Sequence, residues 1–359
     1  MKKKYVAGFL AAAMALSLTA CGGGAPSNGG GEGTQAAGGN EGALITVGFS
    51  QVGAESDWRT ANTESMKATF CEENGFELIF DDAQQKQENQ MTAIRNFIQQ
   101  DVDYIVLAPV TETGWEAVLQ EAKDAGIPVI IVDRMVEVTD DSLYTAWVGS
   151  NFKLEGQKAA AWLGAYLEAT GRGEEEINIV DIQGTIGASA QIGRTEGLEE
   201  GIAAHSNWKM LAQQSGEFTQ AKGQEVMESI LKQSGDQIDV VYCENDNEAF
   251  GAIDAITQAG YEIGTKDGQI MVMSFDTTKA GLTETLAGKI TLDTECNPLH
   301  GPRVQEIIEK LEAGEEVEKD AYVDEVMFAA DDVVTSVNVD GVDYEVTKIT
   351  QEILDGRAY

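Results

Sequence analysis

Charged and amide side chains follow several short apolar runs of this sequence. Asp133 and Arg134 come directly after Val129 to Val132, and Asp276 comes directly after Ile270 to Phe275. Carboxylates accept hydrogen bonds from hydroxyl groups, guanidiniums donate in a planar fork, and an indole covers the apolar face of a ring. This mixture suits a neutral ligand that carries many hydroxyl groups. The candidate set at this position is Ser50, Gln51, Trp58, Arg59, Asp133, Arg134, Gln183, Gly184, Thr185, Arg194, Asn245, Asp246, Asp276 and Asn297.

Each of these residues also has a purely structural interpretation. The Asp133-Arg134 pair can close a strand as a simple ion pair, and Asp276 can cap the helix that follows it. Trp58 is more typical of a core, and Asn245 has the character of a helix N-cap. We favour a binding site because all of them share one position in separate strand-helix units, which random placement would not produce.

Short apolar runs alternate with longer amphipathic segments along the chain. Runs such as Tyr104 to Leu107 are typical of strands covered on both faces by helices. Met91, Ile94, Phe97 and Ile98 form one apolar helix face. Two sets of such units are too many for one open sheet, so we predict an α/β fold with two doubly wound lobes, whose ligands bind at the carboxyl ends of the strands. The predicted strands are 45–49, 76–80, 104–107, 129–132, 177–182, 208–212, 240–242 and 270–275, and the main helices are 56–73, 87–100, 153–170, 189–204, 220–233 and 248–259.

The N-terminal segment has the pattern of an export signal. Lys2 to Lys4 precede an apolar run from Tyr5 to Leu18, which is shorter than the roughly 20 residues of a membrane span. The ending Leu-Thr-Ala-Cys resembles the bacterial lipobox, and this resemblance implies that Cys21 is the lipid-modified first residue of the mature protein. Residues 21–43 are rich in glycine and read as a flexible tether. We therefore predict a signal peptide at 1–20, a lipid-tethered linker at 21–43 and a folded body from residue 44.

The chain is strongly acidic. It has 61 Asp and Glu residues against 24 Lys and Arg residues, which gives a formal net charge of −37. This charge repels phosphate backbones and excludes nucleic acid as a partner.

The residues that carry most catalytic chemistry are sparse. His205 and His300 are the only histidines, neither lies in a metalloprotease motif, and no phosphate-binding Walker sequence is present. We therefore expect no enzyme activity, no cofactor and no metal. Three cysteines follow the N-terminal segment, too few for a disulfide scaffold. One bond is possible among them, with a Cys243–Cys296 bond as a hypothesis, but we favour buried free thiols.

Several long segments resemble the type I periplasmic sugar-binding proteins, the ribose-binding-like family, and among them the galactofuranose-binding members. The similarity runs from Ile45 into the 320s and includes VGFSQVGAESDWR, DDAQQKQENQ, APVTETGW, EAKDAGIPVIIVDR, QSGEFTQAKGQEVMES and YCENDNEAFGAI. The resemblance implies two Rossmann-like lobes joined by a three-strand hinge. It also implies a monosaccharide ligand, galactofuranose or a galactose-like sugar, that is captured by hinge closure and delivered to the membrane permease of an ABC importer.

The same resemblance implies roles for individual residues. In the family, the counterparts of Asp133, Arg134 and Arg194 hold sugar hydroxyls, and the counterpart of Trp58 is the aromatic platform. Asn297 corresponds only loosely to a family hydrogen-bonding position. The complete implied ligand set is Glu55, Trp58, Arg59, Asp133, Arg134, Arg194, Asn245, Asp276 and Asn297.

The resemblance also sets the expected organisation and location. Lobe 1 is expected to comprise 44–149 with about 298–325, and lobe 2 to comprise 150–297 with about 326–359. We expect a monomer outside the cytoplasm, held by its N-terminal lipid to the membrane at the cell surface or in the periplasm. The alternative is a sensory role, in which the binding protein presents its sugar to a membrane chemoreceptor or sensor kinase.

Overall fold

The computed structural model describes residues 43–359, and Leu44–Tyr359 form one compact unit. The predicted signal peptide at 1–20, Cys21 and almost all of the predicted linker at 21–43 lie outside the described residues. Within the described part of the chain, no helix combines the length and the apolar character needed to cross a membrane.

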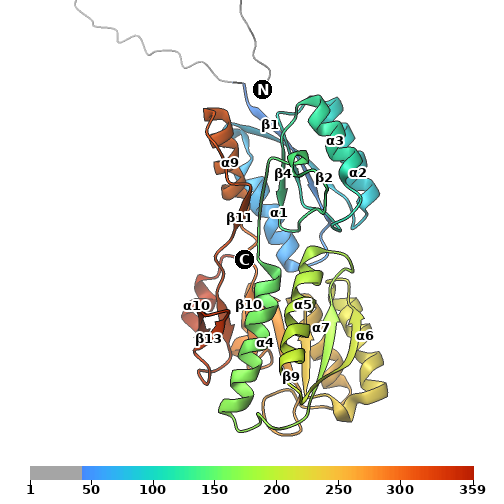
Figure 1. Ribbon diagram of the computed structural model, residues 1–359, viewed down its shortest axis with the longest axis vertical. Coiled ribbons are helices and arrows are strands. Elements are labelled where there is room, and N and C mark those ends of the chain that lie inside the picture. The colour runs from blue at the N-terminus through green and yellow to red at the C-terminus, as the bar shows by residue number, and fades with distance from the viewer. Residues whose placement is uncertain (1–42) are drawn as a thin grey trace, which may run out of the picture. The chain divides into compact units, whose positions relative to one another are not determined.

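The first sheet has six strands in the order β11-β5-β4-β3-β1-β2, and all of its pairings are parallel. We call this sheet and its helices lobe 1 (Figure 1). Its strands are β1 Ile45–Gln51, β2 Phe76–Asp82, β3 Tyr104–Leu107, β4 Val129–Val132, β5 Ala146–Gly149 and β11 Asp320–Tyr322, and its helices are α1 Asp57–Thr69, α2 Gln87–Gln99, α3 Glu116–Ala125 and α9 Gly301–Ala313, with short 3-10 turns at Glu72–Asn74 and Asp141–Leu143.

The second sheet, with its helices, forms lobe 2. Its eight strands have the order β13-β14-β12-β10-β9-β8-β6-β7. The run β10-β9-β8-β6-β7 corresponds to β5-β4-β3-β1-β2 of lobe 1, so the first five strands of each lobe have the same spatial order. The strands are β6 Ile177–Gln183, β7 Trp208–Ser215, β8 Val240–Cys243, β9 Met271–Asp276, β10 Leu292–Glu295, β12 Met327–Ala329, β13 Ser336–Val339 and β14 Val342–Lys348, and the helices are α4 Phe152–Ala169, α5 Ser189–Ala204, α6 Gln220–Ser234, α7 Asp246–Gln258, α8 Lys279–Leu286 and α10 Gln351–Gly356, with a 3-10 turn at Gly235–Gln237.

The central strands are buried on both faces, as the continuous apolar runs predict. In β3, Tyr104 and Val106 join the core under α1 and α9, whereas Ile105 and Leu107 join the core under α2 and α3. In lobe 2, α4 and α5 cover one face of the sheet and α6 and α7 cover the other. Each fully buried aliphatic side chain contributes about 1.5 to 3 kcal/mol, and successive residues of a strand point to opposite faces. The predicted α/β fold with two doubly wound lobes is confirmed.

The chain passes between the two sheets three times. The first passage follows β5 at Gly149, the second follows β10 at Glu295, and the third links Tyr322 of β11 to Met327 of β12. We call these three passages the hinge segments. Hydrogen bonds also join the lobes away from the hinge: Asp57 N–H donates to Asn247 Oδ1 (3.0 Å), and Met135 N–H donates to Ser189 Oγ (2.9 Å). The lobes are therefore in contact, as in a closed form.

The apolar face of α2 differs in part from the prediction. Ile94 and Phe97 are fully buried, but Met91 and Ile98 are only partly buried. Gln90 is buried in their place because its amide donates to Ala108 O (2.6 Å) and its Oε1 accepts from Val110 N–H (2.9 Å). A polar side chain that is satisfied by neighbouring backbone can enter a helix-sheet interface, and the hydrophobic period does not reveal it.

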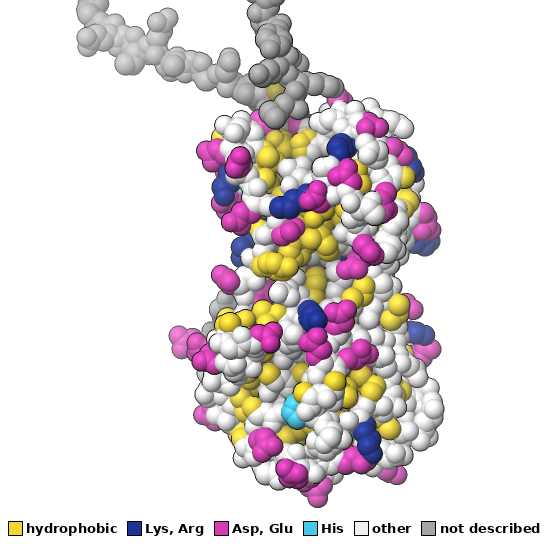
Figure 2. All heavy atoms as spheres, in the orientation of Figure 1, with side chains coloured by type: hydrophobic (Ala, Val, Ile, Leu, Met, Phe, Trp, Pro, Cys, Tyr) yellow, Lys and Arg dark blue, Asp and Glu magenta, His cyan; other side chains and the backbone are white. Residues whose placement is uncertain are grey.

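The surface reflects the acidic composition. Figure 2 shows acidic side chains scattered over the visible face of both lobes, with far fewer lysine and arginine side chains. Several of the described lysines form ion pairs with acidic neighbours at the surface, such as Lys153 with Glu200 (2.7 Å). Exposed pairs of this kind contribute little to stability, about 0 to 1 kcal/mol each.

Candidate functional site

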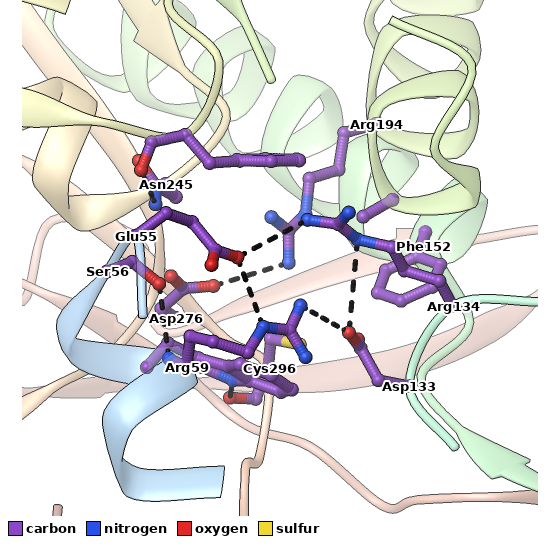
Figure 3. Close-up of a pocket in the computed structure, with 13 residues that line it drawn as sticks. Glu55, Ser56, Arg59, Asp133, Arg134, Phe152, Arg194, Asn245, Asp276 and Cys296 are labelled. Atoms are coloured by element: carbon purple, nitrogen blue, oxygen red, sulfur yellow. Dashed lines mark hydrogen bonds and ion pairs between the residues drawn. The ribbon is translucent and has the colours of Figure 1, made fainter. Parts of the chain in front are cut away.

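A polar pocket lies between the lobes at the carboxyl ends of the strands (Figure 3). The structure brings eight of the nine predicted ligand-set residues to this pocket, and only Asn297 is absent from the lining. The lining residues are Glu55, Ser56, Trp58, Arg59, Asp133, Arg134, Phe152, Ala190, Arg194, Phe218, Asn245, Asp276 and Cys296.

The lobe 1 side of the pocket is a network of two arginines and two acids. Arg59 Nη2 donates to Asp133 Oδ2 (2.7 Å), and Arg59 Nε donates to Glu55 Oε1 (3.1 Å). Arg134 Nη1 donates to Val110 O (2.9 Å), and its Nη2 lies 3.8 Å from Glu55 Oε1. Glu55 Oε2 and Arg134 Nε are buried and have no hydrogen-bond partner among the described residues. One free acceptor and one free donor therefore remain at this wall.

Burial and neighbouring charges shift the pKa values of Asp133 and Arg134 in this network. Burial by itself raises the pKa of Asp133, but the positive charges of Arg59 and Arg134 outweigh it, so this pKa is lowered. Burial, together with the nearby positive charge of Arg59, lowers the pKa of Arg134 to about 10. Asp133 is thus an ionised carboxylate at neutral pH, and it can only accept hydrogen bonds.

The lobe 2 side is organised around Arg194 of α5. Its Nε donates to Glu155 Oε2 (2.7 Å), its Nη1 donates to Glu244 O, and its Nη2 lies 3.5 Å from Asp276 Oδ1. Burial raises the pKa of Asp276 well above its ordinary value, because Arg194 is opposed by the negative charges of Asp246 and Glu155. Asp276 is therefore a carboxyl group that can hold a proton and donate, in contrast to Asp133.

Aromatic side chains cover the remaining walls. Trp58 is almost fully buried, and its Nε1–H donates to Cys296 O on the second hinge segment (2.7 Å). Arg134 lies over the Phe218 ring at 5.1 Å, and Arg194 lies over the Phe152 ring at 5.5 Å. Such cation–π contacts add about 0.5 to 2 kcal/mol each. The guanidiniums are thus held between acids and rings.

Trp58 also packs against the ring of His300. The Trp58 and His300 rings meet edge to face, with centroids 5.8 Å apart, and His300 is fully buried. Burial lowers the pKa of His300 to about 4, so its ring is neutral at pH 7. This neutral ring packs against the indole and adds no charge to the pocket.

The sequence patterns did not indicate five of the lining residues, namely Ser56, Phe152, Ala190, Phe218 and Cys296. Phe152 follows β5 and Phe218 follows β7, so both share the position after a strand that located the charged set. Their apolar side chains do not fit the pattern of charged and amide residues that pointed to the other positions. Gly184 allows Phe218 to approach, since a Cβ on Gly184 would lie 1.9 Å from the Phe218 ring.

Asn245 is the helix N-cap that its structural interpretation predicted and also lines the pocket, whereas Asp276 is not a cap and Asn297 lies outside the pocket. Asn245 Oδ1 does cap α7 by accepting from Glu248 N–H (2.8 Å), while its amide donates to Phe218 O (3.1 Å) at the pocket. The cap of α8 is Thr278 and not Asp276. Asn297 is turned to the hinge: its Oδ1 accepts from Leu299 N–H (2.9 Å), so the loose family correspondence does not bring it to the pocket.

The hypothesis of a Cys243–Cys296 disulfide is wrong. Both thiols are free and buried. Cys243 ends β8 and Cys296 follows β10, and β9 lies between these two strands. Two strand spacings amount to about 9.5 Å, which exceeds the roughly 7 Å limit for the Cα atoms of a disulfide.

Two α/β lobes that close over a shared pocket of acids, arginines and aromatic rings define a binding protein for a small polar molecule. The model of the periplasmic binding protein domain matches residues 47–294. The chain belongs to this family of periplasmic binding proteins, and its two lobes match the type I fold. Membership of the family indicates an extracytoplasmic location.

Several relatives are similar over most of the chain. The galactofuranose-binding protein YtfQ of Escherichia coli is 45% identical over 263 residues, which are 72% of this chain and 80% of YtfQ. A Mycobacterium smegmatis protein solved in complex with β-D-fucofuranose is 43% identical, with a TM-score of 0.76 over 81% of this chain and 93% of that one. The arabinose ABC transporter's binding protein from Shewanella sp. ANA-3, bound to α- and β-L-arabinofuranose, is 42% identical, with a TM-score of 0.74 over 80% of this chain and 93% of that one. These relatives confirm the prediction of a binding protein and not an enzyme.

Proposed function

We propose that this protein is the lipid-anchored, extracytoplasmic substrate-binding protein of an ABC sugar importer, and that it captures a monosaccharide in its furanose form, galactofuranose or a galactose-like sugar, by hinge closure. One observation carries the proposal. Acids, arginines and aromatic rings from both lobes face one pocket, so a molecule bound there contacts both lobes at once. A ligand that bridges the lobes stabilises the closed form through contacts that the open form lacks.

The chemistry of the wall fits a sugar in particular. Arg59 and Arg134 are balanced by Glu55 and Asp133 on the same wall, so the pocket offers no net charge for a strongly ionic ligand. Ionised Asp133 accepts from hydroxyl groups, and Trp58 supplies an apolar face. Among the relatives, the furanose-bound structures and the galactofuranose-binding protein favour a five-membered sugar ring.

The sugar is tested by a thermal-shift screen followed by titration calorimetry. D-galactose, D-fucose, L-arabinose, D-ribose, D-xylose and D-fructose are compared, and methyl galactofuranoside is compared with methyl galactopyranoside to separate the ring forms. We expect the furanoside to stabilise the protein and the matched pyranoside to have a weaker effect. A flat response to every sugar would overturn the proposal.

The anchor and the transporter are tested separately. Replacing Cys21 by Ser is expected to move the protein from the membrane fraction to the released fraction and to remove the mass of the lipid. Deleting the gene is expected to abolish uptake of the identified sugar. Normal uptake together with a lost transcriptional response to the sugar would instead indicate the sensory role.

A further inference from the structure

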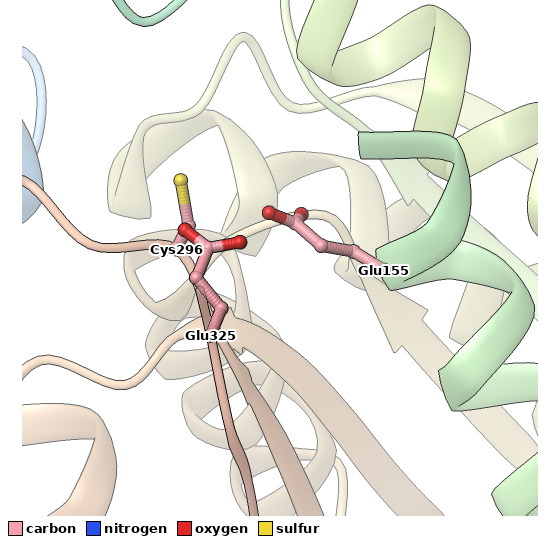
Figure 4. A group of neighbouring side chains, drawn as sticks. All are labelled: Glu155, Cys296 and Glu325. Carbon is pink, nitrogen blue, oxygen red and sulfur yellow. The ribbon is translucent and has the colours of Figure 1, made fainter. Parts of the chain in front are cut away.

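The three hinge segments meet at the carboxyl group of Glu325, which lies on the third segment (Figure 4). Glu325 Oε1 accepts from Ser150 Oγ on the first segment (2.6 Å) and from Asn297 N–H on the second (2.8 Å). Ser150 Oγ also lies 3.3 Å from Cys296 Sγ. One carboxyl group thus ties together all three passages of the chain between the lobes.

A second carboxyl group faces this junction. Glu155, in the first turn of α4, lies with its carboxylate toward Glu325 in Figure 4, and ligand atoms of Glu155, Glu325 and Cys296 lie within 4.8 Å of one another. Glu155 Oε2 accepts from Arg194, but Glu155 Oε1 is buried and has no hydrogen-bond partner within residues 43–359. Two buried carboxylates at this distance repel each other when both are ionised, whereas a proton between them would satisfy Glu155 Oε1.

The surrounding charges decide where that proton resides. Arg194 Nε donates to Glu155 Oε2 (2.7 Å), so this oxygen is already engaged as an acceptor. Burial, and then the charge of Glu155, raise the pKa of Glu325 well above its ordinary value. Glu325 is therefore the carboxyl group that holds the proton.

The other titratable groups near the junction are Cys296, Asp276 and Glu295. The Cys296 thiol remains protonated because burial raises its pKa. Asp276 faces Arg194 from β9 (3.5 Å). Glu295, beside the third segment, is paired with Arg357 (2.8 Å) and accepts from Val326 N–H (3.1 Å).

We propose that Glu155 and Glu325 share one proton in the closed form, so that closure of the lobes on sugar takes up a proton and sugar affinity falls as pH rises. The inference rests on the proposed function, because it describes the same closure. Opening of the lobes twists the hinge segments, which separates the groups that hold Glu325 in place. The exposed carboxyl group of the open form then loses its proton more easily than the buried one does.

Arg194 connects this hinge junction to the pocket. The same guanidinium lines the pocket, lies beside Asp276 and holds Glu155. Ligand contacts that fix Arg194 therefore also fix Glu155 opposite Glu325. A divalent metal bound by Glu155, Glu325 and Cys296 is the competing explanation, but the positive charge of Arg194 opposes a cation at this place.

The test measures the sugar dissociation constant by calorimetry from about pH 5 to pH 9. Wild-type protein is expected to lose affinity with rising pH, by about tenfold per pH unit at most, because one proton is linked to closure. In Glu325→Gln, the side-chain amide N–H can donate to Glu155 at every pH, and the amide oxygen can still accept hydrogen bonds from Ser150 Oγ and Asn297 N–H. This variant is expected to lose less affinity with rising pH than wild type, with any remaining slope due to Asp276 in the pocket, whereas exposed Glu345→Gln should follow wild type.

Other outcomes separate this inference from the proposed function. The absence of sugar binding at every pH would overturn the proposed function, and the shared proton is then tested without sugar. A wild-type minus Glu325→Gln infrared difference spectrum should then contain the carbonyl band of one protonated carboxyl group in crystals of the closed, unliganded protein at neutral pH, and the same band should be weaker in solution, where the open form is populated. A wild-type affinity that does not change with pH, or one that chelators abolish and Zn²⁺ restores, would overturn the inference.

Discussion

Asp133 and Asp276 occupy corresponding positions in the two lobes. Asp133 directly follows β4 and Asp276 is the last residue of β9, and each of these strands is the fourth along the chain in its lobe. Both residues have positive φ angles, 63° and 105°. This conformation costs a residue with a side chain about 1 to 3 kcal/mol. The two lobes therefore use the same strained backbone to direct one carboxyl group each into the pocket, yet the pKa is lowered for Asp133 and raised for Asp276.

The ionised Asp133 should be essential for affinity. Asp133→Asn keeps the shape but loses the charge that accepts from sugar hydroxyls and balances Arg59. We expect the dissociation constant for sugar to rise about 10- to 100-fold, since hydrogen bonds to charged groups contribute about 1.5 to 3 kcal/mol. Calorimetry measures this change.

The same substitution should lower the melting temperature of the unliganded protein, because it leaves two buried guanidiniums short of a carboxylate. The exposed Asp124→Asn is the matched control and should change neither quantity. An Asp133→Asn protein that binds sugar as tightly as wild type would remove Asp133 from the site.

The hydrogen bond from Trp58 to the hinge should have a modest effect. Trp58→Phe retains an aromatic ring but loses the donor to Cys296 O. We expect about a fivefold loss of affinity, which corresponds to one neutral hydrogen bond of about 1 kcal/mol. Trp208→Phe, in the lobe 2 core, is the control and should bind normally. Equal losses in both variants would mean that the effect is general destabilisation.

Thiol labelling should distinguish the three described cysteines. Cys71 is only partly buried, whereas Cys243 and Cys296 are buried and their pKa values are raised by burial. In protein carrying Cys21→Ser, one thiol should react quickly in the folded state, and Cys71→Ser should remove that phase. All three should react after denaturation without reductant. Finding only one reactive thiol under those conditions would contradict the free-thiol structure.

Stability should fall as pH rises through the titration of a buried acid. Burial raises the pKa of Asp181 to about 7, and Asp181 Oδ1 has no hydrogen-bond partner among the described residues. The folded state therefore binds this proton more tightly than the unfolded state does. Its stabilising effect is complete below about pH 4 and is lost as pH rises to about 7.

Asp181→Asn removes this titration. The variant should be more stable than wild type at pH 8, by about 4 kcal/mol at most, and the difference should shrink at pH 5. Chemical denaturation at both pH values measures it, with Asp124→Asn as the exposed control. A variant less stable than wild type at pH 8 would show that Asp181 is ionised in the fold.

Local sequence patterns predicted most elements because their causes are local. The run Val129 to Val132 is β4 in the structure, and the predicted helix 189–204 is α5. The candidate site could be located for a related reason: in a parallel sheet all strands end at the same edge, so residues that follow strands lie together. Phe152 and Phe218 share that position, but in the sequence an apolar side chain after a strand cannot be told from a core residue.

The sequence by itself determined the α/β class, the two lobes and seven of the pocket residues, because burial period and strand ends depend on neighbouring residues, and the family resemblance added Glu55. Only the tertiary structure decided that Cys243 and Cys296 are separated by β9, that Asn297 faces the hinge, and that Glu155 lies opposite Glu325. These relationships join residues far apart in the chain. Their distances and charges depend on how the sheets pack and where the hinge segments cross, which no local pattern specifies.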